Sequence, residues 1–173
     1  MPFEIPPPLI RDKTYLTHRR WMIRALELAE VAGKAGEVPV GAVIVGPEDE
    51  LVAEVANRRE RDQDPTAHAE ILALRAAGQA LKSWRLHHCT LYVTLEPCPM
   101  CAGAIIQARL SLLVYGADDP KTGAVRSVLN LPDSACSNHH LPVLGGILES
   151  ACRQQLQAWF QQHCRQSKAS EVF

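Results

Sequence analysis

The chain has 173 residues, of which 47% are hydrophobic and 21% are charged, and its formal net charge is −1. This length predicts one domain, and this balance is typical of a soluble globular protein. No apolar run approaches the roughly 18 residues of a membrane helix, and the near-neutral charge leaves any nucleic-acid partner to a local basic patch.

The N-terminal stretch MPFEIPPPLIRDK lacks the basic start, apolar core and cleavage site of a signal peptide. We therefore expect a cytoplasmic protein whose six cysteines are reduced or bound to a metal. Its prolines and its lack of periodicity predict a flexible arm over residues 1–17. The folded domain is expected over residues 18–166, followed by a flexible tail over residues 167–173.

The first predicted helix lies within residues 18–37, where apolar residues recur at helical spacing. Two β-branched runs follow at 38–46 and 51–57, and the short PEDE connection between them favours a hairpin. This beginning, followed by alternating helices and strands, predicts an α/β fold: a three-layer α/β/α sandwich with a mixed sheet, parallel at the helical crossovers. The remaining elements are helices at 66–81, 99–110 and 146–166 and strands at 89–95 and 111–117.

Two of the predicted helices begin with residues that can bind a metal. DPTAHAEILAL places His68 and Glu70 at one helix start, and EPCPMCAGAI places Cys98 and Cys101 at the other. Cysteines at i and i+3 share one face of a helix, so both can reach one ion, and His68 can supply a third ligand. Each helix follows the carboxyl end of a strand, which is where open α/β sheets place their sites.

The ligand types favour zinc, because two thiolates and one imidazole suit this ion and three protein ligands leave a position for water. Residues two apart on a regular helix point in different directions, so His68 and Glu70 can serve one site only from the first turn, past the helix end. There Glu70 would be the general base that activates the water. HxE followed by PCxxC is the known signature of zinc-dependent nucleobase deaminases.

Two other kinds of site also use a CxxC pair. A thioredoxin-like redox pair would need neither a histidine nor a glutamate partner, and its fold places the motif in the first βα unit. A closed structural zinc site would need a fourth ligand, but His87, His88 and Cys89 would lie a strand's length away. The sequence therefore favours a catalytic zinc site.

Four stretches resemble the bacterial tRNA-specific adenosine deaminases of the cytidine-deaminase-like superfamily, and the likeness extends from about Trp21 to Phe160. Two of them lie outside the zinc motif, which makes the resemblance specific. It implies a cytidine-deaminase-like mixed five-stranded sheet, one Zn²⁺ per chain, no organic cofactor, no membrane and a homodimer. The stretches are EVPVGAVIV (37–45), DPTAHAEILALR (64–75), LYVTLEPCPMCAGAII (91–106) and YGADDPKTGAVRS (115–127).

The resemblance also implies a reaction and a set of site residues. The expected activity is zinc-dependent hydrolytic deamination of adenosine to inosine at the wobble position of a tRNA anticodon, typically that of an arginine tRNA. The partner is therefore a tRNA anticodon stem-loop. The residues expected in the site are His68, Cys98 and Cys101 as zinc ligands, Glu70 as proton shuttle, and Asn57, Val38 and the backbone of Ala69 as contacts of the flipped-out nucleoside.

Two local clusters are candidates for the RNA surface, although each could equally be a solvated charged loop. One is the run of arginines within residues 58–61, and the other is DDPKTGAVR, which carries Asp119, Lys121 and Arg126. The resemblance favours the second. The cysteines outside the motif are expected to be buried or idle thiols, namely Cys89, Cys136, Cys152 and Cys164.

Two other functions share parts of this pattern. A small-molecule deaminase acting on guanine, cytosine or a pyrimidine nucleotide would have the same zinc ligands, but EVPVGAV and YGADDPKTGAVRS favour the tRNA-editing branch. A non-catalytic RNA-binding subunit stabilised by zinc would be expected to lack the glutamate. The presence of Glu70 favours an enzyme.

Overall fold

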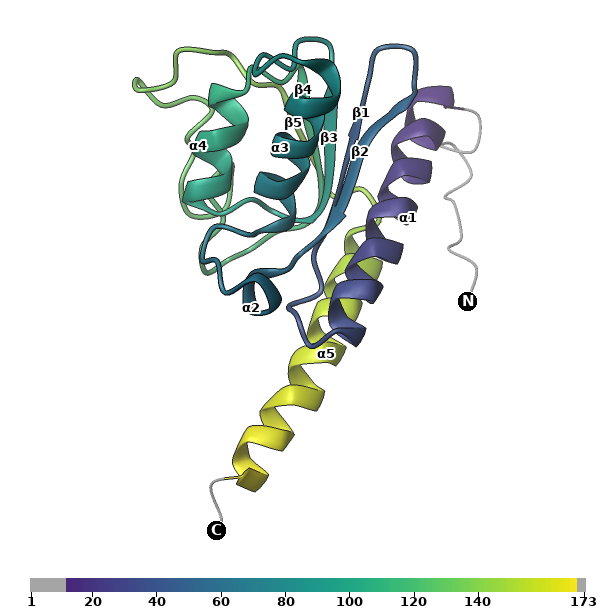
Figure 1. Ribbon diagram of the computed structural model, residues 1–173, viewed down its shortest axis with the longest axis vertical. Coiled ribbons are helices and arrows are strands. Elements are labelled where there is room, and N and C mark those ends of the chain that lie inside the picture. Colours follow the sequence, from purple (N-terminus) through teal and green to yellow (C-terminus); the bar gives the residue numbers. More distant parts are fainter. Residues whose placement is uncertain (1–11, 171–173) are drawn as a thin grey trace.

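The protein folds as a mixed five-stranded sheet with helices on both faces (Figure 1). The computed structural model describes residues 12–170. In the order in which they lie across the sheet, the strands are β2 (Leu51–Ala56), β1 (Gly41–Val45), β3 (Thr90–Leu95), β4 (Leu112–Ala117) and β5 (Val143–Gly145). The helices are α1 (Lys13–Lys34), α2 (Arg59–Asp62), α3 (Ala69–Leu81), α4 (Pro99–Gln107) and α5 (Glu149–Ser170).

The strand directions confirm the expected topology. Strand β1 pairs antiparallel with both β2 and β3, whereas β3–β4 and β4–β5 are parallel pairs. Strands β2 and β3 therefore run the same way, joined by α3, and β3 and β4 are joined by α4. The predicted hairpin and both parallel crossovers are present, and the expected three-layer α/β/α sandwich with a mixed five-stranded sheet is confirmed.

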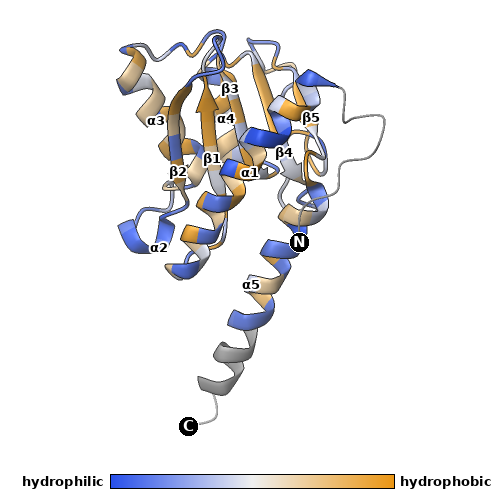
Figure 2. Cartoon of the chain, turned by 90° about the vertical axis from the view of Figure 1, so that its right-hand side faces the viewer, coloured by the Kyte–Doolittle hydropathy of each residue, from blue (hydrophilic) through white to orange (hydrophobic). Residues whose placement is uncertain are grey.

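The sheet separates two apolar layers, which Figure 2 shows as a hydrophobic interior. Helices α1 and α5 cover one face and α3 and α4 cover the other (Figure 1). Every residue of β1 is buried, with Val43 in the layer under α1 and Ile44 in the layer under α3 and α4. A side chain of this size stabilises the fold by about 1.5–3 kcal/mol when fully buried. The apolar run in β1 is thus typical of a strand covered on both faces.

Helix α1 packs directly onto the backbone of β1 at Gly41. A Cβ at this position would collide with the carbonyl oxygen of Ala25 and lie 2.7 Å from the amide nitrogen of Ala29. Neither obstacle is a side chain that could move aside. Only glycine therefore allows this separation of helix and strand.

Gly41→Ala is expected to lower the free energy of unfolding by about 1–3 kcal/mol, because backbone atoms must shift to admit the methyl group. Urea denaturation of both proteins measures the difference. Gly103→Ala is the matched control, because a Cβ at Gly103 in α4 would meet nothing within 4 Å. That variant should be unchanged or more stable by about 0.5–1 kcal/mol, since alanine favours helix. Equal losses in both variants would contradict the close packing of α1 on β1.

Helix α1 begins earlier than the sequence predicted. The Asp12 carboxylate accepts hydrogen bonds from the amides of Thr14 (2.8 Å) and Tyr15 (3.2 Å), which satisfies the first turn. Residues 13–17 are therefore helical, so the predicted boundary between arm and domain at residue 17 is wrong. The apolar periodicity that marks this helix becomes clear only from Trp21 onward, which is why the earlier start was missed.

The chain ends and the short elements also differ from the predictions. Helix α5 continues to Ser170, past the expected start of the tail at residue 167. The rest of the predicted arm and tail, residues 1–11 and 171–173, lies outside the described residues. Helix α2 and strand β5 were not predicted, because four and three residues are too few to show a period. None of the helices within residues 12–170 combines the length and the hydropathy that a bilayer span requires.

Candidate active site

The two predicted metal-binding helix starts come together in the structure. His68 is the N-cap residue of α3, Cys98 is that of α4, and Cys101 lies in the first turn of α4. Neither residue makes a side-chain capping hydrogen bond, and both side chains face the space between the helix ends. Nδ1 of His68 lies 3.7 Å from Sγ of Cys98 and 3.5 Å from Sγ of Cys101.

These separations fit a tetrahedral zinc ion. Zn–S and Zn–N bonds of about 2.3 and 2.05 Å at a tetrahedral angle place sulfur and nitrogen about 3.55 Å apart. The two measured distances lie on either side of this value, and all three ligand atoms lie within 4.8 Å of one another. Across the described part of the chain, no fourth His, Cys, Asp or Glu joins this group. The residues present therefore suit a zinc ion with one position left for another ligand.

The two thiols have opposite pKa shifts. The hydrogen bond with Cys101 is the main cause that lowers the pKa of Cys98 to about 4, and His68 adds to it. The same hydrogen bond, together with burial, raises the pKa of Cys101 well above its usual range. Both shifts have the same main cause, the contact between the two sulfur atoms. A bound zinc ion would need both groups as thiolates.

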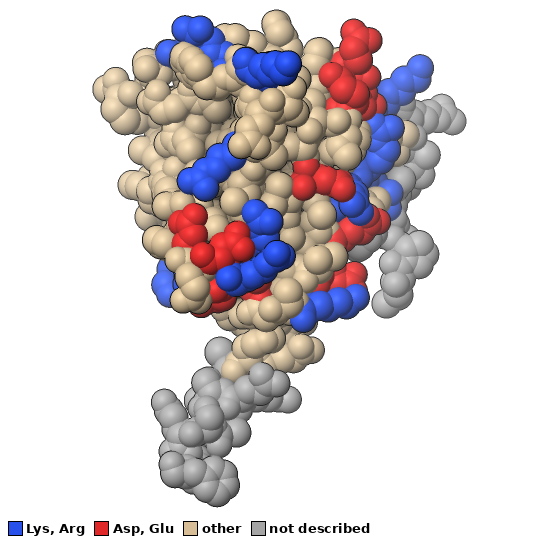
Figure 3. Space-filling view, in the orientation of Figure 1, with Lys and Arg blue, Asp and Glu red and all other residues tan. Residues whose placement is uncertain are grey.

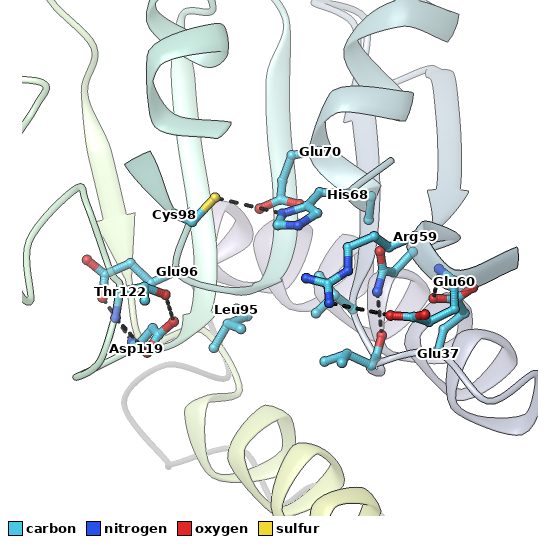
Figure 4. Close-up of a pocket in the computed structure, with 14 residues that line it drawn as sticks. Glu37, Arg59, Glu60, His68, Glu70, Leu95, Glu96, Cys98, Asp119 and Thr122 are labelled. Atoms are coloured by element: carbon cyan, nitrogen blue, oxygen red, sulfur yellow. Dashed lines mark hydrogen bonds and ion pairs between the residues drawn. The ribbon is translucent and has the colours of Figure 1, made fainter. Parts of the chain in front are cut away.

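Glu70 stands beside the ligand group. It lies in the first turn of α3, is 4% exposed, and lines the same cavity as His68 and Cys98. Figure 4 shows its carboxylate next to the His68 ring. Burial raises the pKa of Glu70, and the opposing effect of His68 is smaller. A raised pKa favours a carboxyl group that can hold a proton as well as accept one, which is what a general acid–base catalyst requires.

A cavity of about 150 Å³ opens onto this group, and Val38, Asn57 and Ala69 all line it. Asn57 Nδ2 donates to the carbonyl of Val38 at 3.1 Å, whereas no donor among the described residues reaches the buried Asn57 Oδ1. Ala69 is the first residue of α3, where backbone N–H groups have no partner within the helix. The structure thus brings together all seven residues that the sequence placed around the zinc site and its nucleoside.

The candidate RNA contacts are placed differently from one another. Asp119 lines the cavity. Lys121 is exposed. Arg126 pairs with the carboxylate of Asp118 at 2.7 and 2.9 Å and lies over the ring of Tyr115, with its Cζ 5.5 Å from the ring centre. Its positive charge is therefore already balanced by a neighbour.

The arginines in and just before α2 are also paired. Arg58 and Arg61 each lie near Asp62, at 3.2 and 3.7 Å, and Arg59 lines the cavity. On the face shown in Figure 3, basic and acidic side chains are interspersed. The local basic cluster expected from the sequence is thus partly neutralised by the acidic residues around it.

Two buried carboxylates beside the cavity were not singled out by the sequence. Glu37 and Glu96 are each 2% exposed and both line the cavity. Glu37 accepts hydrogen bonds from the amides of Glu60 (3.1 Å) and Arg61 (2.7 Å) and so holds α2. Burial by itself raises the pKa of Glu96, but hydrogen bonds from the Ser127 side chain and from backbone amides outweigh it and lower the pKa overall.

The fold and a buried glutamate beside a His–Cys–Cys group define the class of hydrolytic deaminases. Residues 16–152 match a family model described as MafB19-like deaminase. A tRNA-specific adenosine deaminase of Haemophilus influenzae is 46% identical over 153 residues, which are 88% of this chain and 88% of that protein. The chain therefore matches the MafB19-like deaminase family and belongs with the tRNA-specific adenosine deaminases, and it is an enzyme.

Solved structures agree with this assignment. One from a study of A-to-I editing by tRNA:A34 deaminases has a TM-score of 0.76 and 44% identity, covering 79% of this chain and 98% of its own. A guanine deaminase from Bacillus subtilis has a TM-score of 0.57 and 34% identity, covering 83% of this chain and 94% of its own. The resemblance seen in the sequence and the expected cytidine-deaminase-like fold are confirmed.

Proposed function

We propose that this enzyme converts adenosine to inosine at the wobble position of a tRNA anticodon, with an arginine tRNA as the expected substrate. The observation that carries the proposal is the convergence of Glu70, the His–Cys–Cys group and the free acceptor of Asn57 on one cavity. The names of the relatives at 44–46% identity support adenosine in tRNA as the substrate.

His68, Cys98 and Cys101 would hold one Zn²⁺ per chain. When bound, the ion supplies a Lewis acid that lowers the pKa of a coordinated water from about 16 to about 7. Glu70 accepts a proton from the attacking water and delivers it to N1 of adenine while the water oxygen adds to C6. Glu70 then takes the second proton of that water from the new C6 hydroxyl and delivers it to the amino group, so that the C6–N bond breaks, ammonia leaves and C6 becomes the carbonyl of inosine. Its burial at 4% exposure suits a carboxyl group that must hold a proton between these steps.

The remaining site residues would bind and orient the base. The free Oδ1 of Asn57 can accept a hydrogen bond from the nucleoside, and the first N–H groups of α3 at Ala69 can donate one. Val38 supplies apolar wall. An adenosine in a single-stranded loop can enter this cavity at low cost, because no base pair has to be broken.

Asn57→Ala is expected to lower kcat/KM for an anticodon stem-loop by about 10- to 100-fold, which corresponds to one lost buried hydrogen bond of roughly 1–3 kcal/mol. Steady-state kinetics on the purified variant measure this. Asn130→Ala is the control, because Asn130 is exposed and bonds to Asp133 away from the cavity. Similar kinetics in both variants would remove Asn57 from the binding site.

The choice of substrate is tested by incubating the enzyme with an anticodon stem-loop and, separately, with guanine, cytosine and cytidine. Inosine in the stem-loop and no product from the free compounds is the expected result. Deamination of the free compounds alone would identify a small-molecule deaminase, as the likeness to a guanine deaminase would then suggest. Binding of the stem-loop without any deamination would identify a non-catalytic RNA-binding subunit.

The proposal includes the homodimer and the cytoplasmic location that accompany a tRNA substrate. An open groove between α3 and α4 has an apolar part formed by Ile71, Leu74, Ala108 and the 59% exposed Trp84, and this part could pack against a second copy. Polar and basic side chains line the rest of it, among them Arg75, Lys82 and Arg85. Sedimentation velocity should give twice the chain mass of 19.1 kDa. A mass of one chain at micromolar concentration would contradict the dimer. Asp119, Lys121 and Arg126 stay the proposed RNA contacts.

A further inference from the structure

Glu96 holds one wall of the cavity through hydrogen bonds that all come from a single segment. Its Oε2 accepts from the amide of Asp119 at 3.0 Å and from the hydroxyl of Ser127. Its Oε1 accepts from the amides of Val125 (3.3 Å), Arg126 (2.8 Å) and Ser127 (2.8 Å). The carboxylate therefore binds both ends of residues 119–127 at once.

The segment 119–127 is closed around this carboxylate. The amide of Gly123 donates to the carbonyl of Asp119 at 2.9 Å, and the amide of Ala124 donates to the carbonyl of Pro97 at 2.9 Å. A Cβ at Gly123 would collide with the Glu96 carboxylate, so the loop fits against it without space for a larger residue. Because Pro97 precedes the metal-ligand candidate Cys98, the loop is tied to the start of α4, which carries the ligand.

The held segment forms part of the cavity. Asp119 and Thr122 line it, and Figure 4 shows them grouped with Glu96 on one side, with Glu37 and Arg59 on the other. The Asp119 carboxylate accepts from the amide of Thr122 at 3.2 Å and from its hydroxyl at 2.6 Å, which keeps the wall rigid within itself. Glu96 is thus the link between this wall and the helix start at Cys98.

We propose that Glu96 is a positioning residue for the RNA substrate. Its carboxylate fixes the distance of the wall formed by Asp119 and Thr122 from the metal-ligand candidates and from Glu70. A nucleotide bound against this wall is therefore held in the correct position for the reaction. This inference rests on the proposed tRNA deaminase activity. Glu96 acts through the loop and makes no contact with the reacting atoms.

The substitution Glu96→Gln affects the hydrogen bonds at the two ends of residues 119–127 differently. The amide keeps the size of the side chain, and its oxygen can still accept from the backbone at Val125, Arg126 and Ser127. Its NH₂ group, however, takes the place of Oε2 and faces the amide N–H of Asp119, donor against donor. We therefore expect the Asp119 end of the wall to loosen while the other end stays held.

The experiment compares zinc content, hydrogen exchange, and kcat and KM for an anticodon stem-loop. Glu96→Gln should keep one zinc per chain, raise exchange in residues 119–123 at least about fivefold, and raise KM at least about tenfold with kcat within about threefold. Ser127→Ala, which removes one hydroxyl donor, should shift KM in the same direction by less. Asp133→Asn also replaces a carboxylate by a neutral amide, but at an exposed position, and it is the control for all three measurements.

Unchanged hydrogen exchange in residues 119–123 of Glu96→Gln would show that Glu96 does not hold this segment in place, whatever the substrate. Faster exchange with an unchanged KM would show a purely structural bond and would also overturn the positioning role. Failure of the wild-type enzyme to deaminate the stem-loop would instead refute the proposed function. The KM comparison would then be made with the free base that the enzyme deaminates, and an unchanged KM there would again overturn the inference.

Discussion

Glu70→Gln is expected to lower inosine formation on an anticodon stem-loop by about 10⁴-fold, the upper end of what general acid–base catalysis contributes. Glutamine fills the same space but cannot take up and release a proton, and Glu70 is asked to do so twice in one turnover. Because Glu70 is not itself in the ligand group, the variant should keep one zinc per chain. Single-turnover kinetics and metal analysis of the same preparation measure both quantities.

Glu48→Gln is the matched control for this prediction. Glu48 lies in the exposed turn between β1 and β2, so the variant loses the same charge far from the cavity and should keep full activity. Thermal stability of Glu70→Gln should be equal to or above that of the wild type, because a neutral amide costs less to bury than a carboxylate. A Glu70→Gln enzyme with bound zinc and full activity would disprove the proton shuttle.

The position of the site could be predicted because its signals are local. His68 follows β2 after the short helix α2, and Cys98 follows β3. Because β2 and β3 run in the same direction, the topology brings both helix starts to the same end of the sheet. The spacing of Cys98 and Cys101 then fixes two ligands on one helix start. What the fold added is the actual approach of His68 Nδ1 to 3.5 and 3.7 Å from the sulfurs.

The two buried carboxylates could not be predicted, because their partners are backbone amides distant in the sequence. Glu96 bonds to amides 23 to 31 residues further along the chain, and Glu37 to amides 23 and 24 residues away. Every residue except proline has a backbone N–H group, so no sequence pattern indicates which of these groups bond to Glu37 or Glu96. For Arg126 the sequence indicated too much: its context is typical of a cation available to RNA. Only the fold shows that the carboxylate of Asp118 neutralises its charge.

Cys101→Ser is expected to weaken zinc binding by more than about 100-fold and to abolish deamination. Loss of a direct ligand should exceed the 10- to 100-fold cost of changing a group that only supports a ligand. The hydroxyl of serine stays protonated near neutral pH, so it cannot replace a thiolate. Zinc per chain after dialysis against a weak chelator, measured together with activity, tests the prediction.

Cys152→Ser separates loss of a ligand from the cost of a buried hydroxyl. Cys152 is 3% exposed and Cys101 is fully buried, and both lie in the first turns of a helix, so the same substitution carries a similar burial cost. Burial raises the pKa of Cys152 to about 12, so its side chain stays a protonated thiol. Cys152 is not part of the His68, Cys98 and Cys101 group. The variant should therefore lose stability but keep one zinc per chain and its activity.

The effect of a chelator on the unfolding temperature also distinguishes loss of a zinc ligand from the cost of burying a hydroxyl, and it does not require an activity measurement. A ligand that binds only the folded state raises its stability in proportion to the logarithm of ligand concentration over Kd. Removal of zinc should therefore lower the unfolding temperature of the wild type and of Cys152→Ser, and should leave that of Cys101→Ser nearly unchanged. If all three proteins responded equally, the ion that stabilises the fold would lie elsewhere than between His68, Cys98 and Cys101, and Glu70 would have no activated water beside it.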